Sequence, residues 1–177
     1  FLRMTPQPAV QAERLADGMR RAWENTRRQP MGAADVSWTV ESVSLPPPKH
    51  LTVEALEAAL KSGTNSTATA GIASRLAWLR RCQAGHQVDV ACLGLGRARV
   101  LHMPGELFVE YQLAAKALRS DLVVAMAAYG DYAPWYIGTA VAYEQGGYET
   151  GPDASNVAPE VEAVLMGAMR TLLQGAR

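Results

Sequence analysis

The segment that decides the fold reads Arg97-Ala-Arg-Val-Leu-His-Met103, then Pro104-Gly105, then Glu106-Leu-Phe-Val-Glu-Tyr-Gln-Leu-Ala-Ala-Lys-Ala-Leu118, and closes with Asp121-Leu-Val-Val-Ala-Met-Ala-Ala128. The first stretch alternates apolar and polar residues, which is typical of a strand. The stretch that begins at Glu106 has apolar residues at helical spacing, and the last is nearly all apolar, as in a strand buried on both faces. Together they predict a strand–helix–strand unit with two parallel strands.

Polar and aromatic side chains follow both strands of this unit. Glu106 is expected in the first turn of the helix, where the helix dipole favours its ionised form. The loop Tyr129–Tyr136 follows the second strand and is crowded with tyrosines. Because parallel strands open their carboxyl ends on one sheet edge, we expect Glu106 and this loop to face each other. A carboxylate beside a phenol can ligate a metal or serve in an acid–base site, whereas the simpler alternative is a helix cap beside a loop that covers a core.

The rest of the chain supplies further helices and strands. Helices are predicted over 8–28, 52–60, 68–83 and 159–173, and strands over 35–45 and 86–93. In the strand over 35–45, Val36, Trp38 and Val40 share one face, which predicts a half-buried strand. Gly94-Leu95-Gly96 turns the strand over 86–93 into the Arg97 strand as a hairpin. The predicted fold class is therefore α/β, with a mixed sheet that joins a hairpin to a parallel βαβ unit and with helices packed on the sheet.

Length and composition limit the function classes. The 177 residues are enough for one domain with a substantial core, so 1–177 is expected to form a single unit. A formal net charge of zero argues against nucleic acid as a partner. No apolar run reaches the ~20 residues of a membrane span, and no signal peptide is visible. Cys82 and Cys92 are expected to be buried free thiols, with a disulfide between them as the alternative.

The region from Leu101 to Glu149 resembles the neutral/alkaline, non-lysosomal ceramidase family, and within it the ceramidase-like bacterial proteins. Two motifs in the right order carry the resemblance, and they cover about a third of the chain. They are Met103-Pro104-Gly105-Glu106, and Tyr136-Ile137-Gly138-Thr139 followed by Tyr143 and Tyr148-Glu149.

The resemblance implies a zinc-dependent amidase. In that family two histidines, a glutamate and a tyrosine hold the metal, which activates a water for attack on the amide. The glutamate ligand falls on Glu106 and the tyrosine ligand on Tyr136. The residues expected to contact the substrate or to surround these ligands are Asp131, Tyr132, Thr139 and His102.

The chain also departs from the family pattern. It lacks the family's histidine-rich motifs and its serine-containing motif, so the zinc ligands are incomplete. The resemblance therefore implies the C-terminal part of a larger catalytic domain, whose N-terminal half lies elsewhere in the protein or on a separate chain. The implied substrate is an N-acyl amide, either a small molecule or a lipid. A secreted or periplasmic location is favoured by the resemblance alone.

Three hypotheses follow, and each predicts a different arrangement. If the chain is part of a zinc amidohydrolase, the isolated chain should expose an apolar surface where the missing half packs. In a non-catalytic binding domain, Glu106 caps a helix and Tyr136 packs in the core. In an unrelated hydrolase, Asp131 and His102 form an acid–base pair within hydrogen-bond reach.

Overall fold

A computed structural model describes residues 8–63 and 66–174 of the chain. By their internal contacts the described residues form two compact units, which divide between Gly32 and Ala33. The first unit contains the helix α1 (Pro8–Glu24), which ends four residues before the predicted boundary. Its apolar residues Leu15, Met19 and Trp23 are all exposed.

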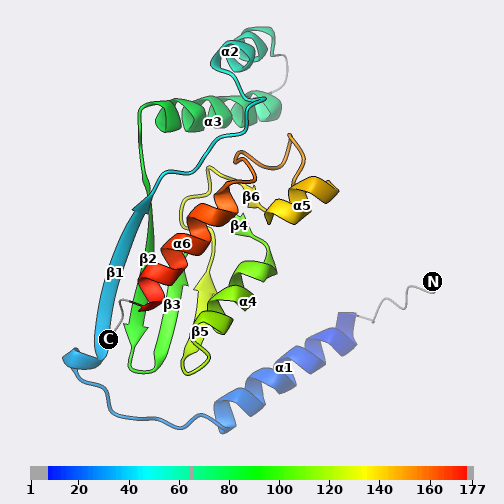
Figure 1. Ribbon diagram of the computed structural model, residues 1–177. Coiled ribbons are helices and arrows are strands. Elements are labelled where there is room, and N and C mark those ends of the chain that lie inside the picture. The colour runs from blue at the N-terminus through cyan, green and yellow to red at the C-terminus, as the bar shows by residue number, and fades with distance from the viewer. Residues whose placement is uncertain (1–7, 64–65, 175–177) are drawn as a thin grey trace. The chain divides into compact units, whose positions relative to one another are not determined.

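The second unit is organised around a four-stranded sheet with the strand order β1-β2-β3-β5 (Figure 1). The strands are β1 (Val36–Val43), β2 (Val88–Leu95), β3 (Ala98–His102) and β5 (Val123–Ala127). β1, β2 and β3 pair antiparallel, whereas β3 and β5 pair parallel. The predicted fold class, a mixed sheet that joins a hairpin to a parallel βαβ unit, is confirmed.

Two helices cover one face of this sheet. α6 (Val161–Gln174) packs on β1 and β2, and α4 (Val109–Leu118) packs on β5 and on α6 (Figure 1). The apolar positions of α6 recur every four residues, so that Leu165, Met169 and Leu173 are fully buried. Because α4 connects β3 to β5, it is the crossover helix that makes those strands parallel.

The helices α2 (Val53–Ser62) and α3 (Ser66–Gln83) form a pair at one end of the sheet (Figure 1). Thr52 caps α2, because its hydroxyl accepts a hydrogen bond from the Ala55 N–H. Leucines from both helices and from the preceding loop make a small separate core. Trp78 of α3 belongs instead to the main core, and its indole N–H donates to the Asn156 carbonyl at 2.9 Å. α3 therefore links the helix pair to the sheet.

The apolar side of β1 points away from the covering helices. Val36, Trp38 and Val40 are 49%, 55% and 48% exposed, whereas Val43, on the opposite side of the strand, is 8% exposed. The alternation predicted a half-buried strand, but the buried side is the one that carries Thr39, Glu41 and Val43. Periodicity separates the two faces of a strand, and only the position of α6 decides which face is covered.

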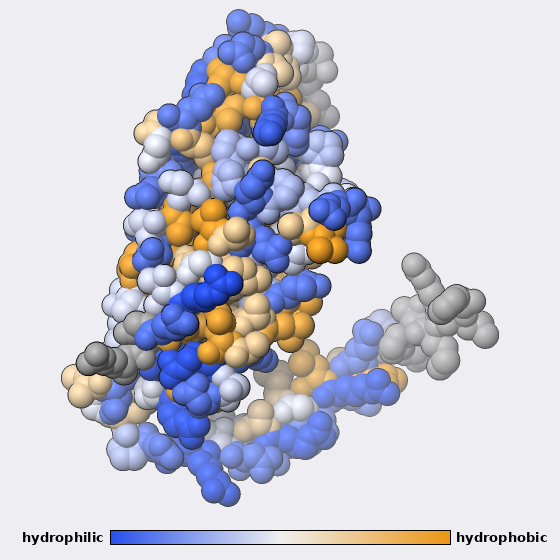
Figure 2. All heavy atoms as spheres, in the orientation of Figure 1, coloured by the Kyte–Doolittle hydropathy of each residue, from blue (hydrophilic) through white to orange (hydrophobic). Residues whose placement is uncertain are grey.

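The strand register extends this exposed side into a continuous apolar surface, which we call the outer sheet face. Its members, from all four strands, are Val36, Trp38, Val40, Ala91, Leu93, Leu95, Ala98, Val100, His102, Val123, Ala125 and Ala127. Most of these side chains are half-buried or exposed. By contrast, the hydrophobic residues visible on the α6 side form several separate patches (Figure 2). An apolar sheet face of this extent is typical of an interaction surface.

Cys82 and Cys92 are free thiols, as predicted, although Cys82 is only partly buried. Burial raises the pKa of both thiols above the ordinary value. Among the described residues, no helix has the length and apolar character needed to cross a bilayer.

The orientation of β1 predicts opposite outcomes for one substitution at two positions. Val40→Thr should change the free energy of unfolding by less than about 0.5 kcal/mol, because the side chain is exposed. Val43→Thr should cost about 1–3 kcal/mol, because it buries a hydroxyl in the core. Denaturant unfolding of both variants tests the assignment, and a larger loss for Val40→Thr would reverse it.

Candidate functional site

Glu106 and Tyr136 lie side by side in a separate two-stranded sheet, on the segments that follow β3 and β5. The two-residue strands β4 (Glu106–Leu107) and β6 (Tyr136–Ile137) pair parallel, with Glu106 opposite Tyr136. The Glu106 N–H donates to the Trp135 carbonyl at 2.8 Å, and the Phe108 N–H donates to the Ile137 carbonyl at 3.0 Å. The segments that follow β3 and β5 therefore converge, as the parallel βαβ unit led us to expect.

Glu106 is nevertheless not in a helix, so the predicted helix start is wrong. α4 begins at Val109 with Phe108 as its N-cap, three residues later than the apolar spacing indicated. The backbone of Glu106 and Leu107 pairs with β6 instead, because tertiary strand pairing outweighs local helical periodicity. The helix dipole argument for Glu106 no longer applies. The binding-domain expectations also fail, because Glu106 lies outside the cap and Tyr136 is only half-buried.

The close approach of the two segments requires glycine at position 105. Gly105 has φ +59°, and a Cβ there would lie 2.5 Å from the Trp135 carbonyl oxygen and 2.8 Å from Cδ1 of Ile137. Its N–H donates to the Asp131 carbonyl, and its own carbonyl accepts from the Tyr129 N–H, both at 2.8 Å. Hydrogen bonds of the Gly105 N–H and carbonyl therefore hold the Pro-Gly-Glu turn against the tyrosine loop.

Four tyrosines gather around the carboxylate, and we call Glu106, Tyr129, Tyr132, Tyr136 and Tyr148 the Glu–Tyr cluster. The rings of Tyr129 and Tyr132 stack with centroids 5.5 Å apart, and those of Tyr136 and Tyr148 meet edge to face at 6.1 Å. Tyr129, Tyr132 and Tyr148 are exposed, so the cluster is open to solvent. The sequence singled out all four tyrosines, in the loop Tyr129–Tyr136 or in the second motif, but not their stacking.

The negative charge of Glu106 dominates the electrostatics of this cluster. It is the largest cause that raises the pKa of Tyr136 above its ordinary value, with partial desolvation second. The pKa of Tyr129 is raised by partial desolvation and by a hydrogen bond and the charge of Glu106. Both phenols therefore carry their protons at neutral pH.

Replacing the carboxylate should be visible in the tyrosine titration. In Glu106→Gln the pKa of Tyr136 should fall toward its ordinary value, because its largest perturbing charge is gone. The ultraviolet absorbance of tyrosinate during an alkaline titration measures this shift. Glu110→Gln, on the exposed first turn of α4, is the matched control and should leave the titration unchanged.

Thr139 and Tyr143 belong to the framework around Tyr136. Thr139 is the N-cap of α5 (Ala140–Gln145) and accepts a hydrogen bond from the Ala142 N–H at 3.2 Å. The hydroxyls of Tyr143 and Ser155 are hydrogen-bonded at 2.7 Å, and Ser155 donates to the Tyr136 carbonyl at 2.8 Å. Ser155 is buried, and no sequence signal distinguishes it from an ordinary loop serine.

Asp131 and His102 have different partners, so the acid–base pair hypothesis is wrong. Asp131 accepts hydrogen bonds from Arg81 at 2.7 Å and from the Ala133 N–H at 3.1 Å. Burial raises the pKa of Asp131, but the hydrogen bond and charge of Arg81 outweigh it, and the net pKa is lowered. His102 packs edge to face on Trp38 at 5.1 Å. Nothing in the sequence indicated that Arg81 would be the partner of Asp131.

Tyr111 fastens α4 to the segment after β6. Its hydroxyl donates to the Gly138 carbonyl at 3.0 Å, and its side chain is fully buried. Burial raises its pKa far above the ordinary value. The Tyr111–Gly138 hydrogen bond therefore persists through the neutral and mildly alkaline range.

Tyr111→Phe should lower the free energy of unfolding by about 1–2 kcal/mol, because the Gly138 carbonyl loses its buried donor. In the parent protein, the proton on Tyr111 contributes stability that is complete below the unfolded pKa of about 10 and declines as the pH rises above it. Denaturant unfolding at about pH 8 and pH 11 should show a smaller alkaline loss in Tyr111→Phe. An equal loss in both proteins would contradict the assignment.

Metal-binding capacity in the described part of the chain is limited. Residues 8–63 and 66–174 contain no group of three or more histidine, cysteine, aspartate or glutamate side chains placed to hold a metal ion. Glu106 and Tyr136 offer one carboxylate and one phenol. They can supply part of a coordination sphere and no more.

Comparison with known proteins bears on the fold. No model of a known protein family matches the sequence, and no curated protein matches it. Among solved structures, neutral ceramidase from Pseudomonas aeruginosa matches with a TM-score of 0.53 and 16% identity over 88% of this chain. A structure described as ceramidase complexed with C2 matches 50% of this chain and 15% of its own, with a TM-score of 0.42 and 18% identity.

This chain spans 31% of the length of the Pseudomonas ceramidase. At 16% identity the likeness is one of fold, and it extends well beyond the third of the chain that carries the sequence motifs. The resemblance noted in the sequence is confirmed at that level: the chain has the fold of one part of neutral ceramidase.

Proposed function

We propose that this chain supplies part of the active site of a metal-dependent amide hydrolase, with Glu106 and Tyr136 as two ligands of a zinc ion. One observation carries the proposal: the carboxylate and the phenol stand on paired residues of adjacent strands. In the described part of the chain, no ion pair of Glu106 is recorded. Oxygen donors brought together without a cationic partner favour a bound cation.

The electrostatics of the cluster fit a divalent metal. Glu106 alone disfavours the ionised form of Tyr136, because two negative charges repel. A dication bound to both oxygens reverses that effect and lowers the pKa of the phenol. Zinc accepts carboxylate oxygens, and when bound it lowers the pKa of a water to about 7 and polarises a carbonyl.

Other residues of this chain orient the two ligands. Tyr129 lies close enough to Glu106 for the carboxylate to raise the pKa of its phenol, and a neighbour of this kind typically orients a metal ligand. The backbone of Tyr136 is held on both sides, by the Ala154 carbonyl at 3.1 Å and by the Ser155 hydroxyl at 2.8 Å. Tyr132 is an exposed member of the cluster and is available to contact an amide substrate.

The remaining ligands come from outside this chain. We assign residues 1–177 to the C-terminal part of a larger catalytic domain, whose N-terminal half completes the site. The outer sheet face supports this assignment, because it is an apolar surface of the kind that a missing half covers. The expected substrate is an N-acyl amide, with lipid amides included, and a secreted or periplasmic location follows from the same resemblance.

The first test is the metal content and intact mass of the natively purified protein. Elemental analysis and mass spectrometry should find stoichiometric zinc together with the completing region, either in the same polypeptide or in a second one. Glu106→Ala and Tyr136→Phe should each lose zinc and hydrolysis of a fluorogenic N-acyl amide. Losing a protein ligand should reduce metal affinity at least as much as losing a supporting residue, which costs about 10–100-fold.

One control variant separates the loss of a metal ligand from the loss of a carboxylate elsewhere on the surface. Glu110→Ala removes an exposed carboxylate from α4 and should keep zinc and activity. Full zinc occupancy in Glu106→Ala, or a natively purified protein that contains the completing region but no metal, would contradict the proposal.

A further inference from the structure

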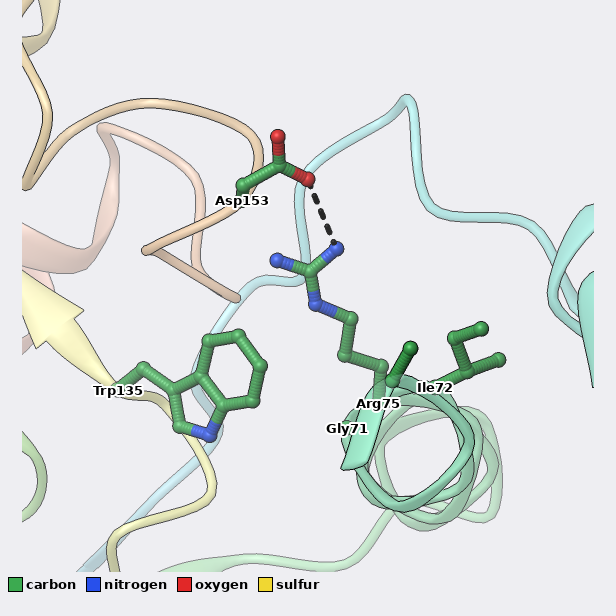
Figure 3. A pocket seen from close by; sticks show the side chains of 6 residues that line it. Gly71, Ile72, Arg75, Trp135 and Asp153 are labelled. Atoms are coloured by element: carbon green, nitrogen blue, oxygen red, sulfur yellow. Dashed lines mark ion pairs between the residues drawn. The ribbon is translucent and has the colours of Figure 1, made fainter. Parts of the chain in front are cut away.

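A concave site lies between α3, the end of the loop before β6, and the loop between α5 and α6. It is a cavity of about 230 Å³ lined by Ala68, Gly71, Ile72, Arg75, Trp135 and Asp153. Figure 3 shows Arg75 reaching from α3 toward Asp153, with the indole of Trp135 on one side and Gly71 and Ile72 on the helix. A cavity with apolar walls around one guanidinium is suited to bind a small amphiphilic anion.

Arg75 is held firmly but incompletely. Its guanidinium lies 4.7 Å from the centroid of the Trp135 ring, and Nη2 donates to the Pro152 carbonyl at 2.8 Å. Its Nε is buried and has no hydrogen-bond partner in the described part of the chain. The side chain is only 13% exposed, so the charge is largely removed from water. An additional hydrogen-bond acceptor would therefore stabilise this largely buried guanidinium.

The carboxylate that now faces Arg75 is a weak partner. Nη1 of Arg75 lies 3.5 Å from Oδ1 of Asp153, which is longer than the roughly 2.7–2.9 Å of a charge-assisted hydrogen bond. The Asp153 side chain is 95% exposed, and exposed partners contribute little because solvent screens them. Displacing Asp153 from Arg75 therefore costs little free energy when a better-placed carboxylate binds.

We infer that this cavity binds a small organic carboxylate, whose charged end replaces Asp153 at Arg75 and whose hydrocarbon part lies against Ile72, Ala68 and the edge of Trp135. A single planar guanidinium matches a carboxylate of one charge. A phosphate group is a poorer match, since the cavity has one cation and mostly apolar walls. The volume is below the roughly 300–1,000 Å³ of pockets for drug-sized ligands, which limits the ligand to a short chain or one ring.

This inference does not depend on the zinc proposal, because it concerns other side chains and needs no metal. The test uses the full chain labelled with ¹⁵N and follows the indole N–H of Trp135 by nuclear magnetic resonance, assigned with Trp135→Phe. Titration with hexanoate should move this signal saturably. Hexanamide, which has the same chain without the charge, and inorganic phosphate should not move it.

Three variants test which side chains bind the carboxylate and which compete with it. Arg75→Gln should weaken hexanoate binding at least about tenfold, because the charged donor is lost. Asp153→Asn should tighten binding several-fold, because the competing carboxylate is removed while Arg75 stays. Arg80→Gln, on the same helix and paired with Glu57, is the control and should bind as the parent does.

Each contrary result overturns the inference. Equal binding of hexanamide makes the cavity an apolar hollow only, and equal binding of phosphate makes it a general anion site. Weaker binding in Asp153→Asn makes Asp153 a supporting residue rather than a competitor. Asp153→Asn leaves Arg75 and its contacts in place. Hexanoate binding to this variant therefore tests the inference even if Arg75→Gln fails to fold.

Discussion

The pairing of β4 with β6 is the interaction on which the rest of the site depends. Two residues from each segment are enough, because Gly105 lets the backbones approach to a distance that no side chain at that position allows. The loop between β5 and β6 is then held by hydrogen bonds to Met103 and Gly105. Glu106 and Tyr136 are therefore placed by backbone geometry, before any side-chain interaction or ligand contributes.

The two faces of the main sheet differ in what covers them. α4 and α6 build a close-packed core on one side, where Leu101, Leu165 and Met169 are fully buried. The outer sheet face is also apolar, but most of its side chains are only half-buried or are exposed. Burying such a surface is favourable in proportion to its apolar area, so a partner sheet or helix layer gains substantially from covering it.

Sequence patterns predicted the elements better than their exact use. The hairpin, the parallel βαβ unit and the convergence of Glu106 with the tyrosine loop all followed from periodicity and from the rules of strand connection. Prediction failed where two parts of the chain compete for one backbone, as at Glu106, which pairs with β6 instead of starting α4. It also missed Arg81, which lies 50 residues from its partner Asp131, and Ser155, which lies in the irregular loop between α5 and α6.

By itself the sequence determined which residues are apolar, where glycine and proline interrupt the elements, and that a carboxylate and tyrosines follow two parallel strands. These are local properties, set by residue type and spacing. Only the tertiary structure decided which face of β1 is covered, that Asp131 pairs with Arg81, and that Arg75 meets Trp135 beside a cavity. Such choices depend on contacts between distant segments, whose energies no local pattern records.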